Sequence, residues 1–413
     1  MATIVQKFGG TSVGDVTKIK RAAEKVKREY DAGNRVVTVV SAMGKSTDTL
    51  VQLANDISDS PDKREMDMLL STGEQVTISL MVMALKEMGI DAVSLTGWQA
   101  GIKTEPVHQN ARITNIDTER LESYLGDGKV VIVAGFQGMS ENGDITTLGR
   151  GGSDTTAVAI AAALNAESCS IFTDVTGVYT CDPRVAKKAR QLQSISYDEM
   201  LELANLGAGV LHPRAVEFAK NFQLPLIVRS STVDKEGTIV EEEASMEQNL
   251  VVRGLAFEGA VTKITIERLP NRFHTMSDVF SSLAESGIDV DIIIQQMTGE
   301  NEMNVSFSLN TEKLSEALQV LENNRERLEY KAIRHEDSLA KVSIVGSGMI
   351  SNPGVAANMF QVLSDNEIEI KMVSTSEIKV SVVVPEENMV NAIEVLHTAF
   401  ELDTREASKV TIS

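Results

Sequence analysis

Short apolar runs alternate with amphipathic stretches along the first two-thirds of the chain. The apolar runs predict buried strands, and stretches with apolar residues three and four positions apart predict helices. Strands are expected at residues 2–8, 36–40, 92–95, 130–134, 170–172 and 226–228. Helices are expected at residues 15–32, 66–88, 118–124, 154–165 and 197–206. This alternation is typical of an α/β fold, with a mostly parallel sheet sandwiched by helices.

The last third of the chain has a different pattern, which occurs twice. Apolar positions of residues 279–293 recur in 359–373 at an offset of 80, and those of 305–321 recur in 380–396 at an offset of 75. Each copy opens with an alternating strand, at 263–267 or 341–345, and continues as helix, strand, strand, helix. We therefore predict domains at 1–245, 263–335 and 341–405, the last two being ferredoxin-like α+β domains, with an acidic linker at 241–248.

Charge and cysteine content narrow the class of protein. The net charge of −20 over 413 residues argues against a nucleic-acid partner, and any phosphate site must be locally basic. Cys169 and Cys181 are too few for a disulfide framework or a zinc site, so we predict no metal-ligand site. No segment approaches the roughly 20 apolar residues of a membrane span. The expectation is a cytoplasmic protein.

One stretch, Leu148-Gly149-Arg150-Gly151-Gly152-Ser153-Asp154, has glycines that packing does not explain. Glycines let backbone N–H groups approach a ligand closely, and the start of the following helix favours negative charge. Ser153 or Gly152 is the expected helix N-cap. Arg150 adds a planar fork suited to a carboxylate or phosphate. An ordinary glycine-rich loop before a helix would explain this stretch equally well.

Polar and glycine residues also gather at the carboxyl ends of the predicted strands, at 7–10, 41–43, 135–136 and 173–174. Ligands of parallel sheets bind beyond these ends, which favours a nucleotide or phosphorylated-substrate site. Two common phosphate motifs are excluded. Residues 44–47 resemble the end of a P-loop, but Val39 stands where its first glycine is required, and no G-x-G-x-x-G follows a strand.

Four motifs taken together resemble the aspartate kinase family of the amino acid kinase superfamily. They are Lys-Phe-Gly-Gly-Thr-Ser at 7–12, Ser-Ala-Met at 41–43, the glycine motif at 148–154, and Thr-Asp-Val-Thr-Gly-Val-Tyr at 173–179 with Asp-Pro-Arg at 182–184. The resemblance implies ATP- and Mg²⁺-dependent phosphorylation of the side-chain carboxylate of L-aspartate to 4-phospho-L-aspartate. That carboxylate is already ionised at neutral pH, so no general base is needed.

The resemblance also implies roles for individual residues. Lys7 would stabilise charge on the transferred phosphoryl group, Asp154 would organise Lys7, and Arg150 would pair with the α-carboxylate of aspartate. The implied ATP contacts are Lys7, Phe8, Gly9, Gly10, Ser41, Gly151, Gly152, Thr173, Asp174, Tyr179, Asp182 and Arg184. The implied aspartate contacts are Thr47, Glu74, Arg150, Gly151, Gly152 and Ser153, with Glu74 receiving the α-ammonium group. The role of Lys235 is left open.

The C-terminal repeat resembles a pair of ACT domains. This implies feedback inhibition by lysine, threonine or both, and a homo-oligomer formed through these domains. Candidate effector contacts, each of which also fits a loop or capping role, are Asp278, Gln295, Met349, Ser351, Asn352, Pro353, Gly354, Val355, Thr375, Ser376 and Glu377. Met246 could start a separately produced C-terminal fragment.

Two other functions fit the same fold class. The first is a non-catalytic amino-acid sensor that keeps the kinase fold, against which Lys7, both glycine loops and Asp154 argue. The second is a kinase of another small acid such as glutamate or carbamate, against which Glu74, Arg150 and the tandem sensor domains argue.

Overall fold

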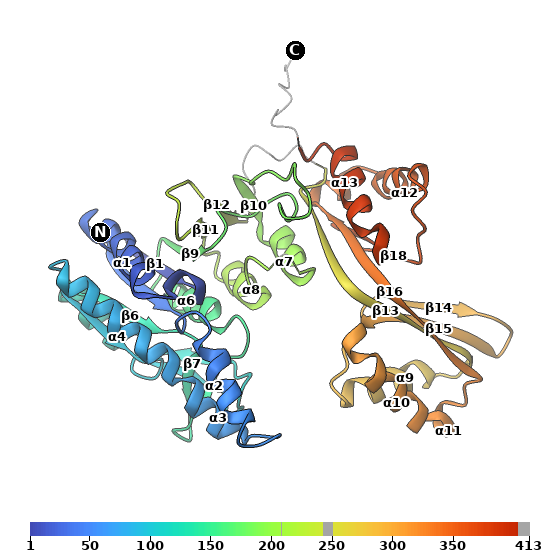
Figure 1. Ribbon diagram of the computed structural model, residues 1–413, viewed down its shortest axis with the longest axis horizontal. Coiled ribbons are helices and arrows are strands. Elements are labelled where there is room, and N and C mark those ends of the chain that lie inside the picture. The colour runs from blue at the N-terminus through green and yellow to red at the C-terminus, as the bar shows by residue number, and fades with distance from the viewer. Residues whose placement is uncertain (208, 243–250, 404–413) are drawn as a thin grey trace, which may run out of the picture. The chain divides into compact units, whose positions relative to one another are not determined.

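The computed structural model describes residues 1–207, 209–242 and 251–403, which form two compact units (Figure 1). The first unit takes residues 1–179, 191–205 and 209–242, and the second takes residues 180–190, 206–207 and 251–403. The chain therefore leaves the first unit at residue 180 and returns to it at residue 191. It leaves again at residue 206, returns at residue 209, and is in the second unit from residue 251 onward.

The first unit contains an eight-stranded sheet in the order β10-β12-β11-β9-β1-β2-β6-β3. The pairs from β11 across to β3 are all parallel, whereas β12 is antiparallel to β11, and β10 follows the direction of β12. The strands are β1 (Thr3–Phe8), β2 (Arg35–Val40), β3 (Ala92–Leu95), β6 (Val130–Ala134), β9 (Ser168–Thr173), β10 (Ser194–Ser196), β11 (Leu226–Ser230) and β12 (Thr238–Glu241). The predicted, mostly parallel α/β sheet is confirmed.

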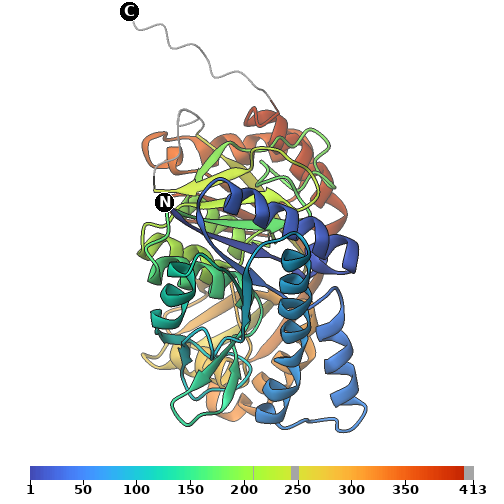
Figure 2. The same cartoon turned by 90° about the vertical axis from the view of Figure 1, so that its left-hand side faces the viewer.

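Helices cover this sheet. The helices of the first unit are α1 (Val16–Asp31), α2 (Ser46–Asn55), α3 (Lys63–Leu70), α4 (Thr72–Glu87), α5 (Glu119–Gly126), α6 (Gly152–Ala163), α7 (Tyr197–Asn205) and α8 (Pro213–Asn221), of which α2 and α3 pack on each other and, through α3, on a second, smaller sheet rather than on this one. α1 and α4 lie side by side, as Figure 1 and Figure 2 show, and pack their apolar faces on β1, β2, β6 and β9 in one buried cluster. α6 packs against β1, β2 and β9 and against α8. The sheet is thus buried between helices.

The helix predicted at 66–88 is two helices, because the chain turns at Ser71 between α3 and α4. Together they form the one stretch of the described residues, Lys63–Glu87, whose length and apolar composition would suit a membrane span, and half of it is buried. Met81 and Leu85 on α4 are fully buried in the cluster with α1 and β6. The apolar character of α4 is therefore that of a core helix.

A second, smaller sheet of the first unit was not predicted. It has the order β5-β4-β7-β8 and is formed by β4 (Ile102–Thr104), β5 (Ile113–Ile116), β7 (Gln137–Ser140) and β8 (Ile145–Thr147). Strands of three or four residues carry too few alternating positions to give a clear period, which explains why the sequence pattern missed them. β7 and β8 lie between β6 and the glycine motif, so this sheet leads the chain into the site.

The second unit contains one antiparallel sheet in the order β14-β15-β13-β16-β18-β17. Its strands are β13 (Gly254–Pro270), β14 (Ile293–Met297), β15 (Glu302–Asn310), β16 (Ala332–Val345), β17 (Met372–Thr375) and β18 (Lys379–Pro385). Its helices are α9 (Thr275–Glu285), α10 (Leu314–Asn323), α11 (Arg325–Leu328), α12 (Val355–Asp365) and α13 (Met389–Ala399). α9 and α10 lie beside one end of the long strands, and α12 and α13 beside the other (Figure 1). The repeated strand-helix-strand-strand-helix order is confirmed.

β13 and β16 are longer than predicted because each serves both copies of the repeat. The first part of β13 pairs with Lys341–Val345, and its later part pairs with residues 332–339. Leu255 of β13 accordingly lies in the core of the second copy with Val342 and Ile344. Ile333 of β16 packs against the core of the first copy. The two copies therefore share their central strands.

A segment far away in the sequence completes the core of the second copy. Cys181 and Ala186, both buried, belong to the same cluster as Val342, Met359 and Leu396. The Thr180 side chain lies 2.9 Å from Nε2 of the buried His397, and its backbone carbonyl accepts from Leu255 N–H at 2.7 Å. Residues 180–190 are thus structurally part of the repeat unit, which the periodic pattern did not indicate.

Candidate active site

A cavity of about 280 Å³ lies at the carboxyl ends of β1 and β2, beside the start of α6. Predicted residues from five separate stretches of the chain meet there. Those that line it are Lys7, Gly10, Ser41, Thr47, Glu74, Arg150, Gly151, Gly152, Ser153 and Asp154. Ala42, Gly44, Phe136 and Gly149 complete the lining. The topology thus brings the N-terminal motif and the glycine motif to one site.

Lys7 and Asp154 form an ion pair inside this cavity. Nζ of Lys7 lies 2.6 Å from Oδ1 of Asp154, and each side chain is 12% exposed. Oδ1 has no hydrogen-bond donor in good geometry, so the contact is an ion pair rather than an aligned hydrogen bond. Lys7 is the last but one residue of the central strand β1, and Asp154 lies in the first turn of α6. The pair holds a cation where an incoming phosphoryl oxygen could reach it.

Glu74 is a buried carboxyl group on α4, with 3% of the residue exposed. It accepts from the backbone N–H of Ala42 at 3.2 Å and from Nε2 of Gln137 at 3.3 Å. Burial raises its pKa to about 7, although these hydrogen bonds act in the opposite direction. A cation entering the cavity beside Glu74 would favour the ionised form, which suits the predicted partnership with an ammonium group.

The glycine motif turns sharply before α6. The N-cap is Gly151, with φ of 70°, and not Ser153 or Gly152 as predicted. The prediction failed because Ser and Asn usually cap through their side chains, whereas here the left-handed backbone of Gly151 begins the helix. Gly152 and Ser153 are already helical. The backbone N–H of Gly152 donates to the carbonyl of Gly149 at 3.0 Å, whereas that of Ser153 belongs to the unpaired first turn, which can face an anion.

Two residues of this site were missed by sequence reasoning. His212, which precedes α8, packs so closely on Gly151 that a Cβ there would lie 2.1 Å from the imidazole Cγ. Its Nδ1 is buried without a hydrogen-bond partner, and burial lowers its pKa. Arg214 donates to the carbonyl of Leu148 at 2.9 Å and of Ala111 at 3.1 Å. Pro213 signals a helix start, but nothing in the pattern connects it with the glycine motif.

The remaining predicted ATP contacts do not line this cavity. Phe8 is fully buried and its ring stacks on Phe172, so only its backbone could face a ligand. Thr173 ends β9 next to Asp174, and Tyr179 bonds Thr176 at 2.7 Å. Gly9 comes two residues after Lys7, and a Cβ at Gly9 would lie 3.3 Å from Lys7 Nζ.

Asp182 and Arg184, also predicted to contact ATP, belong to the second unit. The Arg184 guanidinium lies 2.7 Å from the Asp182 carboxylate and holds its pKa below the usual range. Lys235, whose role was left open, lies in the loop between β11 and β12, away from the cavity.

The predicted effector residues lie at loops and helix starts of the second unit. Asp278 is in the first turn of α9, and Gln295 is on the edge strand β14. Met349 and Ser351 lie in a 3-10 turn, and Asn352, Pro353 and Gly354 lead into Val355 at the start of α12. Thr375 ends β17, and Ser376 and Glu377 form the turn to β18. Met246 lies outside the described residues.

No group of three or more His, Cys, Asp and Glu side chains in the described part of the chain is arranged to hold a metal ion. Mg²⁺ that accompanies a nucleotide does not need such a cage, because it binds mainly to phosphates and water with one or two carboxylates. Asp154 is a carboxylate of the cavity that fits this requirement.

Comparison with known proteins gives a consistent result. Residues 2–230 match the model of the amino acid kinase family, and residues 342–400 match an ACT domain model. The chain is 65% identical over 402 residues to an aspartokinase of Bacillus sp. (strain MGA3) and, equally, to aspartokinase 2 of Bacillus subtilis (strain 168), covering 97% of this chain and 98% of each relative. E. coli aspartokinase III, solved with aspartate and ADP, is similar in structure with a TM-score of 0.79 at 28% identity, covering 96% and 99% of the two chains.

Proposed function

The chain belongs to the amino acid kinase family, as an aspartokinase with C-terminal ACT domains, and on this premise we propose that it transfers the γ-phosphoryl group of ATP to the side-chain carboxylate of L-aspartate. The product is 4-phospho-L-aspartate. The observation that carries the proposal is the meeting of Lys7, Asp154, Glu74 and Arg150 around one cavity. Solved E. coli aspartokinase III holds aspartate and ADP, which supports the same pair of ligands here.

The cavity supplies what a phosphoryl transfer needs, which is positioning and charge neutralisation. Arg150 is exposed at the rim, where its guanidinium can bind the α-carboxylate of aspartate through two parallel hydrogen bonds. Buried Glu74 receives the α-ammonium group. These two contacts leave the side-chain carboxylate free to attack, and it needs no base because it is ionised at neutral pH.

Lys7 and the glycine loops neutralise the transferred group. Charge spreads over the three equatorial oxygens in the transition state, and Lys7 Nζ, oriented by Asp154, is the cation placed to bind one of them. Backbone N–H groups near Gly10 and at the start of α6 are further donors. Mg²⁺, when bound with ATP, supplies additional neutralisation of the phosphates. Thr173, Asp174, Tyr179, Asp182 and Arg184 are proposed to hold the nucleoside and the phosphate tail.

Regulation is proposed to act through the second unit, with lysine, threonine or both as inhibitors in a cytoplasmic homo-oligomer. A structure of E. coli aspartokinase III holds lysine together with aspartate. Strand β14 is an edge of the six-stranded sheet, and all five of its residues are exposed. Unpaired edges of this kind favour pairing with a second chain. The residues from Asp278 to Glu377 named above are the proposed effector contacts.

The test is an assay of the purified full chain with ATP, Mg²⁺ and one acid at a time. We expect ADP formation with aspartate, and hydroxylamine should trap the acyl phosphate as the hydroxamate. Equal turnover with glutamate or carbamate would favour the kinase of another acid. A folded protein that binds lysine or threonine but forms no ADP with aspartate would favour the non-catalytic sensor.

A further inference from the structure

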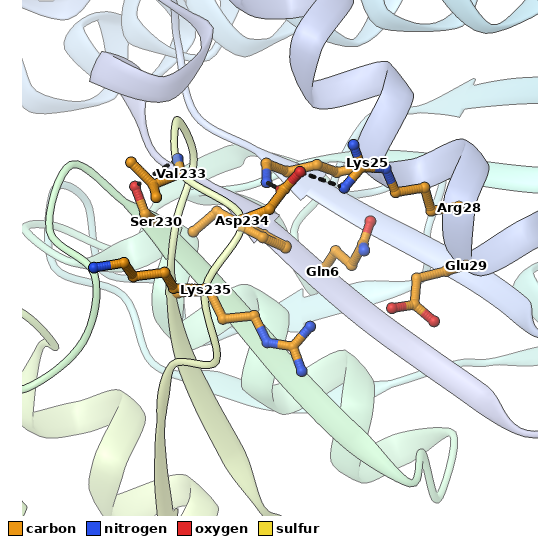
Figure 3. Close-up of a pocket in the computed structure, with 10 residues that line it drawn as sticks. Gln6, Lys25, Arg28, Glu29, Ser230, Val233, Asp234 and Lys235 are labelled. Carbon is orange, nitrogen blue, oxygen red and sulfur yellow. Dashed lines mark hydrogen bonds and ion pairs between the residues drawn. The ribbon is translucent and has the colours of Figure 1, made fainter. Parts of the chain in front are cut away.

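A second polar pocket, of about 190 Å³, lies on the other face of the main sheet, beneath α1. It is bordered by β1, β9 and β11 and by the loop that carries Lys235 (Figure 3). Successive residues of a strand face opposite sides, so Gln6 on β1 faces this pocket while Lys7 faces the catalytic cavity. No residue is shared between the linings of the two cavities, so this pocket is a separate site.

The pocket is locally basic in a strongly acidic chain. Lys25, Arg28, Arg229 and Lys235 carry four positive charges, against the two negative charges of Glu29 and Asp234. Asp234 contacts two of these cations, because its oxygens lie 2.7 Å from Lys25 Nζ and 2.7 Å from Arg28 Nη1. Its single negative charge neutralises only one of them. Such a local excess favours an anionic occupant.

Buried polar atoms in the pocket lack partners. Gln6 is 1% exposed, and its Oε1 has no hydrogen-bond donor. The buried Nε of Arg229 has no acceptor. Buried polar groups are rarely left unpaired, because desolvation without a hydrogen bond is costly. A ligand that fills the pocket should therefore offer an acceptor to Arg229 and a donor to Gln6.

Gln6, Glu29 and Lys235 line this pocket, and Figure 3 shows Gln6 and Glu29 on one side and Lys235 on the other, with Asp234 bonded to the α1 cations. Glu29 is a second acceptor there, and its Oε2 accepts from Asn34 Nδ2 at 3.0 Å. An oxyanion without a proton offers no donor to these two acceptors, whereas one that keeps an O–H group can donate to Gln6. The pocket volume equals that of roughly six water molecules at about 30 Å³ each, enough for a small oxyanion and its waters.

We propose that this pocket is a binding site for hydrogen phosphate, whose oxygens bind Arg229 and Lys235 and whose O–H donates to Gln6. The site is distinct from the phosphate contacts of ATP at Lys7 and the glycine loops. It gives Lys235, which has no ion-pair partner among the described residues, a function outside the catalytic cavity. The proposal does not depend on the function proposed above.

The test is calorimetric titration of the full chain, at about pH 7.5 and constant ionic strength, with inorganic phosphate, with sulfate and with methyl phosphate. Sulfate has no proton at this pH, and a phosphomonoester, with a second pKa of about 6, has mostly lost its own. We expect saturable phosphate binding at least about tenfold tighter than that of either other ion, the difference of one hydrogen bond to a charged group. Comparable binding of sulfate, or of the phosphomonoester, would overturn the proton-selective site.

Variants locate the binding. Lys235→Gln should weaken phosphate binding about tenfold, whereas Lys20→Gln, the same charge change on an exposed position of α1 outside the pocket, should leave it unchanged. Gln6→Leu should remove the preference for phosphate over sulfate. Lys7→Ala should retain binding. Loss of the heat in Lys7→Ala, with wild-type binding in Lys235→Gln, would assign phosphate to the catalytic cavity and overturn the proposal. Lys235 is exposed, so that variant should fold.

Discussion

Lys7 lies at the end of β1 with its ammonium group held by Asp154 at 2.6 Å. This charge matters most when the phosphoryl oxygens carry transition-state charge. We therefore expect Lys7→Ala to lower kcat about 100-fold, or about 3 kcal/mol, with little change in the KM for aspartate. Steady-state kinetics with Lys20→Ala as the control measure this. A variant with near-normal kcat and a raised KM would mean that Lys7 only binds substrate.

Arg150 is proposed to grip a carboxylate with two donors, which an ammonium group cannot do. Arg150→Ala should raise the KM for aspartate about 10- to 100-fold, equivalent to about 1.5–3 kcal/mol for hydrogen bonds to a charged group. Arg150→Lys should recover little of this loss, although it restores the charge. Wild-type affinity for aspartate in the lysine variant would exclude the two-bond contact.

Glu74 gives the site a dependence on pH. Its pKa is raised to about 7 by burial, so in the free enzyme the carboxyl group becomes protonated as the pH falls through 7. The protonated form cannot pair with the α-ammonium group of aspartate. We expect kcat/KM for aspartate to fall below about pH 7 and to level off above it, and Glu74→Gln to be low and flat over the same range. An unchanged profile in Glu74→Gln would assign the pH dependence to another group.

At the scale of elements, the start of α6 depends on one backbone conformation. Gly151 has φ of 70°, and a Cβ there would lie 2.1 Å from His212 Cγ. Gly151→Ala should therefore lower the free energy of unfolding by more than the left-handed backbone alone would, which costs a residue with a Cβ about 1–2 kcal/mol. We expect a lower thermal midpoint and at least about tenfold lower activity, because the donors at the start of α6 move.

Gly143 provides the matched control, since its φ is 83° and a Cβ there would meet nothing within 4 Å. Gly143→Ala should show the backbone strain without the clash. Replacing His212 by Ala in the Gly151→Ala protein should recover the part due to the clash. If the two glycine variants lose equal stability, His212 does not constrain the loop.

Elements were predictable from the sequence to different degrees, for physical reasons. The strands 92–95 and 130–134 were found to the residue. Residues 130–134 form a continuous apolar run, which marks a strand covered on both faces. The turn at Ser71 and the short strands β4, β5, β7 and β8 were missed, since a single turn or a strand of three or four residues leaves no period. Most of the residues lining the cavity followed from motifs at strand ends and from the glycine motif, whereas Thr47 and Glu74 followed only from the family resemblance. His212 did not, because its role comes from the packing of α8 on α6.

At the scale of the whole molecule, the repeat unit includes residues 180–190, so a fragment of residues 246–413 lacks part of its own core. This fragment keeps the six-stranded sheet and its helices, and we expect it to fold, dimerise and bind an inhibitory amino acid without ATP. Without Cys181 and Ala186 it should be about 2–4 kcal/mol less stable than the same unit in the full chain. Calorimetric titration with lysine and threonine measures effector binding, and urea unfolding measures the stability of the fragment.

In the full chain, Ala186→Asp should unfold the repeat unit at lower urea, because Ala186 is buried in that unit. It should also raise the KM for ATP, because the proposed ATP contacts Asp182 and Arg184 lie in the same segment. If the fragment and the intact unit have equal free energies of unfolding, residues 180–190 contact the core without stabilising it. Effector binding by the fragment should not depend on aspartate, since reciprocal coupling needs both units.

The early position of residues 180–190 has a consequence for synthesis on the ribosome. Cys181 and Ala186 emerge with the kinase sheet, but their partners Met359 and Leu396 are translated roughly 200 residues later. At about 5–20 residues per second, the nascent chain carries this apolar segment uncovered for on the order of 10–40 seconds. A chaperone that binds such segments would meet the chain in this interval. Premature termination before β16 would leave all strands of the kinase sheet in place. Cys181 and Ala186 would then stay exposed, and the product would be prone to aggregate.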